Sequence, residues 1–223
     1  MILSVTGARA THVSCLGFED RHEDGIFRVG ANLRDNTFSN ETAPVRTSDG
    51  GMCRINEFRR VGWNSEKTPS VYMSMFGTLG SFEQNAVSSS WSALKREETA
   101  DVTQHLSCKQ IVPKHGNEEL YRELQTDFYK GVSMAHPVKR LPEEYIGMDN
   151  GHEGSHQFLV DDFVQSVAAG KLPPNHAWAA AKYCAPGLVA HESALRGGSM
   201  LEIPDFGEPS ANWQFLNPID ISE

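Results

Sequence analysis

The order of the predicted elements along the chain constrains its fold more than any other feature. Segments rich in β-branched and aromatic residues, separated by Gly, Asp and Asn, predict strands within residues 10–18, 37–45, 51–62, 69–76 and 80–94. No long helical pattern separates consecutive strands, so the crossover helices that parallel strands need have no room. The sequence therefore predicts an open, mainly antiparallel β-sheet.

Helical patterns follow in the second half of the chain and predict the layer that covers this sheet. Apolar residues at helical spacing indicate helices over residues 117–130, 155–170 and 175–198. Pro186 lies inside the last of these and predicts a kink or a break near Cys184. We expect an α+β fold in a single domain over residues 1–223, with helices packed on one face of the sheet.

The composition narrows the classes of partner. The net charge is −9, and the Lys and Arg residues are scattered, which argues against binding to nucleic acid or to a membrane surface. No segment approaches the roughly 20 apolar residues of a membrane span. The four cysteines form no Cys-x-x-Cys pair, so we expect free thiols, no zinc ribbon and a cytoplasmic location.

One pentapeptide, residues 152–156, has the spacing of a zinc-protease motif. His152 and His156 would lie one helical turn apart, with Glu153 as the general base. Gly154 opposes a helix interior, however, and the third His of the extended motif is missing. Zinc hydrolysis is therefore the less favoured alternative, and we assign no metal ligand.

An ordered set of motifs carries a resemblance to a known family. The motifs are GGMCRINEFRR (50–60), GTLGSF (77–82), DNGHEGSH (149–156), FLVDDF (158–163), APG (185–187), HESA (191–194) and IPDF (203–206). Together they resemble the family of glucose-fructose oxidoreductase, inositol dehydrogenase and MocA. Members of that family join an N-terminal Rossmann domain, which binds NAD or NADP, to a C-terminal domain with an open sheet.

The resemblance covers only the C-terminal domain. The sequence contains no Gly-x-Gly-x-x-Gly turn between a strand and a helix, so we expect the chain to lack the Rossmann domain and to bind no cofactor alone. The resemblance implies a substrate-binding and oligomerisation domain of an NAD(P)-dependent oxidoreductase acting on a sugar, a polyol or a glycoside. We expect a truncated chain that is inactive alone. The alternative is a stand-alone, non-catalytic binding or assembly module.

Four residues are candidates for the substrate site. His152 and His156 flank a glycine loop at a helix N-terminus, where they can bind sugar hydroxyls or relay a proton as catalytic residues, or serve only as capping and surface residues. Glu57 and Arg59 alternate onto one face of a strand and can clamp a polyol, or form only a solvated ion pair. For His191, near a helix end, a structural role is favoured.

A sheet with one face left uncovered tends to bind a partner. We therefore expect a homodimer or a tetramer joined through the open face of the sheet.

Overall fold

The computed structural model describes residues 2–60, 72–85, 87–107, 109–110, 132–133, 137–142, 155–211 and 213. The chain divides into two compact units. Unit 1 combines residues 1–70 with 177–209, and unit 2 combines residues 71–176 with 210–223. The predicted single domain over residues 1–223 stays a prediction, and the predicted helix over residues 117–130 lies outside the described residues.

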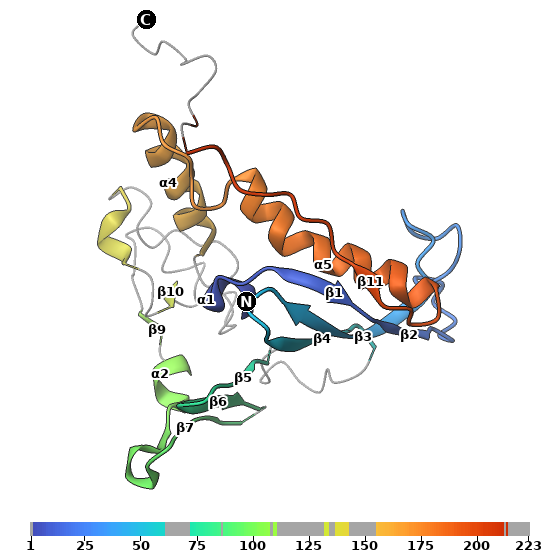
Figure 1. Ribbon diagram of the computed structural model, residues 1–223, viewed down its shortest axis with the longest axis horizontal. Helices are drawn as coiled ribbons and strands as arrows, with labels where there is room; N and C mark the ends of the chain where they lie inside the picture. Colours follow the sequence, from blue (N-terminus) through green and yellow to red (C-terminus); the bar gives the residue numbers. More distant parts are fainter. Residues whose placement is uncertain are drawn as a thin grey trace, which may run out of the picture. The chain divides into compact units, whose positions relative to one another are not determined.

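Unit 1 is a five-stranded antiparallel sheet with a long helix along one face (Figure 1). Its elements are α1 (Ile2–Thr6), β1 (Ala10–Val13), β2 (Leu16–Glu19), β3 (Phe38–Thr47), β4 (Met52–Phe58), α5 (Ala177–Leu195) and β11 (Leu201–Glu202). Every pairing among its described strands is antiparallel, and α5 packs against β1, β2, β3 and β11. The predicted α+β class, with an open antiparallel sheet and a helix on one face, is confirmed.

The ten-residue strand β3 organises this sheet. One edge of β3 pairs with β2 along its first half and with β1 along its second half, while β4 pairs with the other edge. The single strand predicted over residues 10–18 is therefore two strands. Between β1 and β2 the pairing with β3 is interrupted at Cys15, whose N–H donates to the Ser193 hydroxyl instead.

The core of unit 1 lies between α5 and the sheet. The helix presents small buried residues, Ala185, Ala190 and Ala194, to a sheet face that includes Val13 and Val45. Short side chains let the helix approach the strands closely, which explains the near-complete burial of Val13. Helix α5 continues through the buried Pro186, so the predicted break near Cys184 is absent, while the predicted kink stays a prediction.

The end of α5 is fixed to the corner between β1 and β2. Gly197 and Gly198 have φ values of 66° and 89°, and the Gly198 N–H donates to the Ser193 carbonyl at 2.9 Å. The helix therefore ends at these two glycines, as the sequence predicted. The Ser14 hydroxyl donates to the Gly198 carbonyl at 2.6 Å. The Ser193 hydroxyl accepts from the Cys15 N–H at 2.9 Å and donates to the Ser199 carbonyl at 2.6 Å.

A long loop between β2 and β3 is held by Arg60. The guanidinium of Arg60 contacts Asp20 at 3.0 Å and Asp24 at 2.6 Å, and it lies 5.2 Å from the centre of the Phe27 ring. The hydrogen bond from Arg60, followed by one from the Ile26 N–H, lowers the pKa of Asp24 from 3.8 to about 2. Arg60 thus anchors the loop through the side chains of Asp20 and Asp24.

We expect the Asp24 anchor to weaken only in strong acid. Because the pKa of Asp24 is lowered in the folded chain, its contribution to stability is complete above about pH 4 and is lost as the pH falls toward 2. The carboxyl NMR signal of Asp24 followed against pH measures this midpoint. In Arg60→Gln the midpoint should rise toward 3.8. An unchanged midpoint would show that Arg60 is not the cause.

Unit 2 contains smaller elements. They are β5 (Ser74–Phe76), β6 (Gly80–Gln84), β7 (Ser89–Ala93), η1 (Arg96–Glu98), β8 (Ala100–Asp101), α2 (Thr103–Ser107), β9 (Lys109–Gln110), β10 (Val132–Ser133), η3 (Val138–Arg140) and α4 (Ser155–Ala168). Strands β5 to β8 form one antiparallel sheet, and β9 pairs with β10.

Unit 2 differs from the sequence prediction in one strand and agrees with it in the bounds of α4. The single strand predicted over residues 80–94 is a hairpin of two strands. The chain turns there because the Asn85 side chain accepts hydrogen bonds from the N–H groups of Val87 and Ser88. Helix α4 begins at Ser155 and is followed by Gly170 with φ 61°, close to the predicted bounds. In its apolar stripe Phe158 is buried, whereas the other four side chains, Leu159, Phe163, Val164 and Val167, are 37% to 54% exposed, so the expected packing of the stripe against a sheet stays a prediction.

Candidate functional site

The predicted Glu57–Arg59 ion pair is present at the end of β4. The Arg59 Nε atom lies 2.7 Å from the Glu57 Oε1 atom, and the two side chains are 68% and 60% exposed. Ion pairs this exposed contribute little to stability. Both groups are accessible to a ligand, and their role as a polyol clamp stays a prediction.

A second pair, Glu41 and His191, lies beside the first. In the pairing of β3 with β4, Glu41 is directly opposite Glu57, so both carboxylates are on the same face of the sheet. The His191 Nδ1 atom lies 2.8 Å from the Glu41 Oε1 atom, and the two side chains are 22% and 21% exposed. His191 therefore has a specific partner 150 positions away, which sequence spacing could not reveal.

An aromatic ring borders the second pair. Gly17 on β2 is opposite Glu41 on β3, and the Phe38 ring covers the position that a Gly17 side chain would occupy. A Cβ atom added to Gly17 would lie 2.4 Å from this ring. The Phe38 ring in turn meets the His191 ring edge-on, with 6.0 Å between their centres. We name Phe38, Glu41, Glu57, Arg59 and His191 the Glu41 cluster.

The two predicted catalytic histidines belong to the other unit. His156 is exposed in the first turn of α4, and His152 lies outside the described residues. Their catalytic role stays a prediction. Within the described ranges, no group of three His, Cys, Asp or Glu side chains could hold a metal ion.

An ion-pair network in unit 2 joins η3 to α4. The Arg140 Nε atom lies 2.8 Å from the buried Asp161 Oδ2 atom, and the Arg140 Nη2 atom lies 3.0 Å from Asp162 Oδ1. The same guanidinium lies 5.2 Å from the centre of the Phe158 ring. No well-aligned hydrogen bond to Asp161 Oδ2 is present among the described residues, so the attraction between the charges carries this contact. The network has a structural role, because Arg140, Asp161 and Asp162 pair with one another within unit 2.

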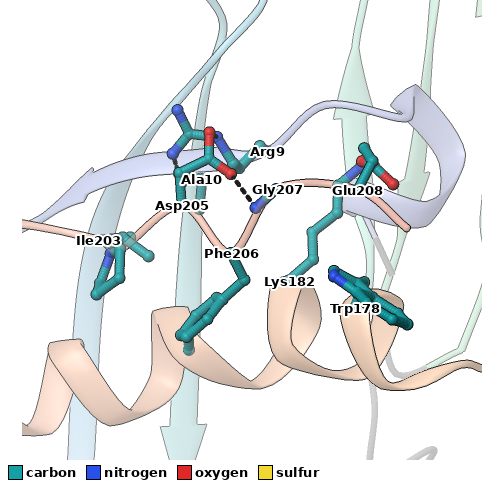
Figure 2. A pocket seen from close by; sticks show the side chains of 11 residues that line it. Arg9, Ala10, Trp178, Lys182, Ile203, Asp205, Phe206, Gly207 and Glu208 are labelled. Atoms are coloured by element: carbon teal, nitrogen blue, oxygen red, sulfur yellow. Dashed lines mark hydrogen bonds and ion pairs between the residues drawn. The ribbon is translucent and has the colours of Figure 1, made fainter. Parts of the chain in front are cut away.

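A small pocket lies in unit 1 where the segment after β11 passes α5. Figure 2 shows Trp178, Lys182 and Phe206 lining it, with Arg9 paired to Asp205 at 3.0 Å. The Lys182 ammonium donates to the Gly7 carbonyl at 2.9 Å, at the end of α1. The cavity volume is about 20 Å³, which holds about one water molecule. The pocket is too small to hold a sugar, and the Arg9–Asp205 ion pair attaches the segment after β11 to the start of β1.

The described cysteines are free thiols, Cys15, Cys53 and Cys184. Burial, with the nearby Glu41 carboxylate, raises the pKa of Cys15 to about 11, and burial also raises the pKa of Cys53. These two thiols are therefore poor nucleophiles at neutral pH. None of the described helices is both long enough and apolar enough to cross a membrane.

An open antiparallel sheet with a long covering helix defines an α+β domain, and solved structures of oxidoreductases share this fold. An oxidoreductase domain protein from Kribbella flavida matches with a TM-score of 0.54 and 13% identity, over 91% of this chain and 48% of that chain. An oxidoreductase from Agrobacterium radiobacter, in complex with NAD+, L-tartaric acid and magnesium, matches with a TM-score of 0.53 and 10% identity, over 87% and 43% of the two chains.

Levoglucosan dehydrogenase, in complex with NADH and L-sorbose, matches with a TM-score of 0.51 and 12% identity, over 88% of this chain and 45% of that chain. No family model and no curated protein matches the sequence. The chain spans less than half the length of each of these three oxidoreductases. The predicted resemblance is confirmed at the level of the fold.

Proposed function

We propose that this chain is the substrate-binding and oligomerisation domain of an NAD(P)-dependent oxidoreductase that acts on a sugar, a polyol or a glycoside. The observation that carries the proposal is the shared fold with oxidoreductases that include levoglucosan dehydrogenase. The exposed Glu57–Arg59 pair supports it, because a fixed carboxylate and a guanidinium together accept and donate hydrogen bonds to hydroxyl groups.

The chain's part in such a reaction is to bind and orient the substrate. Hydride transfer requires a nicotinamide, which supplies the redox chemistry. The sequence offers no glycine-rich turn for a pyrophosphate, so the residues of this chain do not fit a dinucleotide. We therefore propose that the chain alone binds neither NAD nor NADP and is inactive without a dinucleotide-binding domain.

The face of the sheet opposite α5 is the proposed oligomer interface. Phe18, Met52 and Phe58 alternate with the residues that face α5, and they are between 44% and 76% exposed. Burial of such side chains in an interface stabilises association. We propose that a homodimer or a tetramer forms through this face.

Binding of polyols to the purified chain tests the proposal. Levoglucosan and L-sorbose, titrated in saturation-transfer NMR, should bind in the millimolar range, and Glu57→Gln should weaken binding about tenfold or more because one charged acceptor is lost. NAD and NADP should give no signal. Glu192→Gln is the control, because it removes an exposed carboxylate from another Glu–Arg ion pair of unit 1, that with Arg196.

Three results would count against the proposal. They are the absence of binding to either polyol, equal binding by Glu57→Gln, and binding of NAD by the chain alone. Light scattering on the same samples measures the mass, and a monomer would contradict the proposed interface. A stable oligomer that binds no polyol would instead favour a non-catalytic assembly module.

A further inference from the structure

We propose that the Glu41 cluster is a single binding surface for the adjacent hydroxyl groups of an uncharged sugar or polyol. This inference rests on the proposed function and extends the candidate site from the Glu57–Arg59 pair to Glu41, His191 and Phe38.

The strand register fixes the spacing of the two carboxylates. Glu41 and Glu57 are directly opposite in an antiparallel pair, which places their Cβ atoms roughly 5 Å apart. Like charges at this spacing repel one another. Each carboxylate has its own basic partner, since Glu41 contacts His191 and Glu57 contacts Arg59. The register and these partners therefore place two hydrogen-bond acceptors side by side on one face of the sheet.

His191 adds a third polar group to this surface. When Nδ1 carries the hydrogen that it donates to Glu41, the second ring nitrogen, Nε2, is an acceptor. Within the described part of the chain, the imidazole of His191 makes one hydrogen bond, the bond to Glu41. The His191 side chain is 22% exposed.

Phe38 supplies an apolar wall. Its ring occupies the space above Gly17 and contacts the edge of the His191 ring. A sugar ring carries C–H groups that pack on aromatic rings while its hydroxyl groups bond to carboxylates. The absence of a side chain at Gly17 is what permits this ring position.

The charges favour a neutral ligand. With His191 neutral, the carboxylates of Glu41 and Glu57 face the single guanidinium of Arg59, which disfavours an anionic ligand. The described residues also contain no group suited to a metal ion.

Glu41→Gln and His191→Gln test the inference in the levoglucosan and L-sorbose titrations. Each variant keeps a side chain of similar size, and each should weaken polyol binding about tenfold or more, as Glu57→Gln does, while Glu192→Gln binds as the wild type does. In addition, the imidazole NMR signals of wild-type His191 should shift on titration with the polyol. This second measurement does not depend on the folding of the half-buried variants.

The outcomes separate this inference from the proposed function. If the wild type binds polyol and Glu57→Gln weakens binding, but Glu41→Gln, His191→Gln and the His191 signals show no effect, the inference is wrong and the proposed function stands. If the wild type binds neither polyol, both are wrong. Weakened binding by folded Glu41→Gln and His191→Gln, together with shifted His191 signals, supports both.

Discussion

Replacement of Ser193 by alanine is expected to lower the free energy of unfolding of unit 1 by about 2 to 3 kcal/mol. The Ser193 side chain is fully buried, and its hydroxyl both accepts from the Cys15 N–H and donates to the Ser199 carbonyl. Alanine would leave two backbone groups without this partner at the corner that joins α5 to the sheet. Each unsatisfied buried group costs about 1 to 3 kcal/mol.

Urea unfolding followed by circular dichroism measures this change, and Ser199→Ala is the matched control. The Ser199 hydroxyl donates only an exposed bond, to the Arg196 carbonyl at 3.0 Å, so its loss should cost less than about 1 kcal/mol. Equal stability of Ser193→Ala and the wild type would mean that the hydroxyl does not hold this corner.

Replacement of Arg140 by methionine is expected to destabilise the contact between η3 and α4 by about 2 kcal/mol. The Asp161 side chain is 7% exposed, and Arg140 lies 2.8 Å from it. Removal of one partner leaves a buried charge uncompensated, which typically costs 3–5 kcal/mol. The expected loss is smaller here because the Arg140 side chain is 41% exposed and water screens part of the interaction.

Lys139→Met is the control for Arg140→Met, because it removes an exposed charge from the adjacent position of η3. Hydrogen exchange of the α4 amides, measured by mass spectrometry, should accelerate in Arg140→Met and not in Lys139→Met. The double variant Arg140→Met with Asp161→Asn should recover part of the loss, since it removes the uncompensated charge. Unchanged exchange in Arg140→Met would refute the proposed role of the ion pair.

Local sequence patterns predicted the fold class because the relevant signals are local. The lack of helical segments between strands excluded crossovers, and every pairing in the described sheets is antiparallel. Gly197 and Gly198 marked the end of α5 through backbone conformations that glycine adopts readily. The patterns failed where a tertiary contact interrupts a strand, as at Cys15, or where one side chain forms a turn, as at Asn85.

One part of the candidate site was predictable from local sequence, and the other part was not. The two-residue alternation of a strand was sufficient to place Glu57 and Arg59 on one face, and their ion pair is present. Glu41 and His191 are 150 positions apart and share no motif. Their contact depends on the register of β3 and on the packing of α5, and both are properties of the folded chain.

The sequence by itself determined the antiparallel α+β architecture, the approximate helix ends and the Glu57–Arg59 pair, because each depends on residues close together along the chain. Only the tertiary structure decided that Pro186 continues a helix, that residues 10–18 form two strands, and that His191 meets Glu41 beside Phe38. These features arise from contacts between distant segments, whose free energies outweigh local preferences.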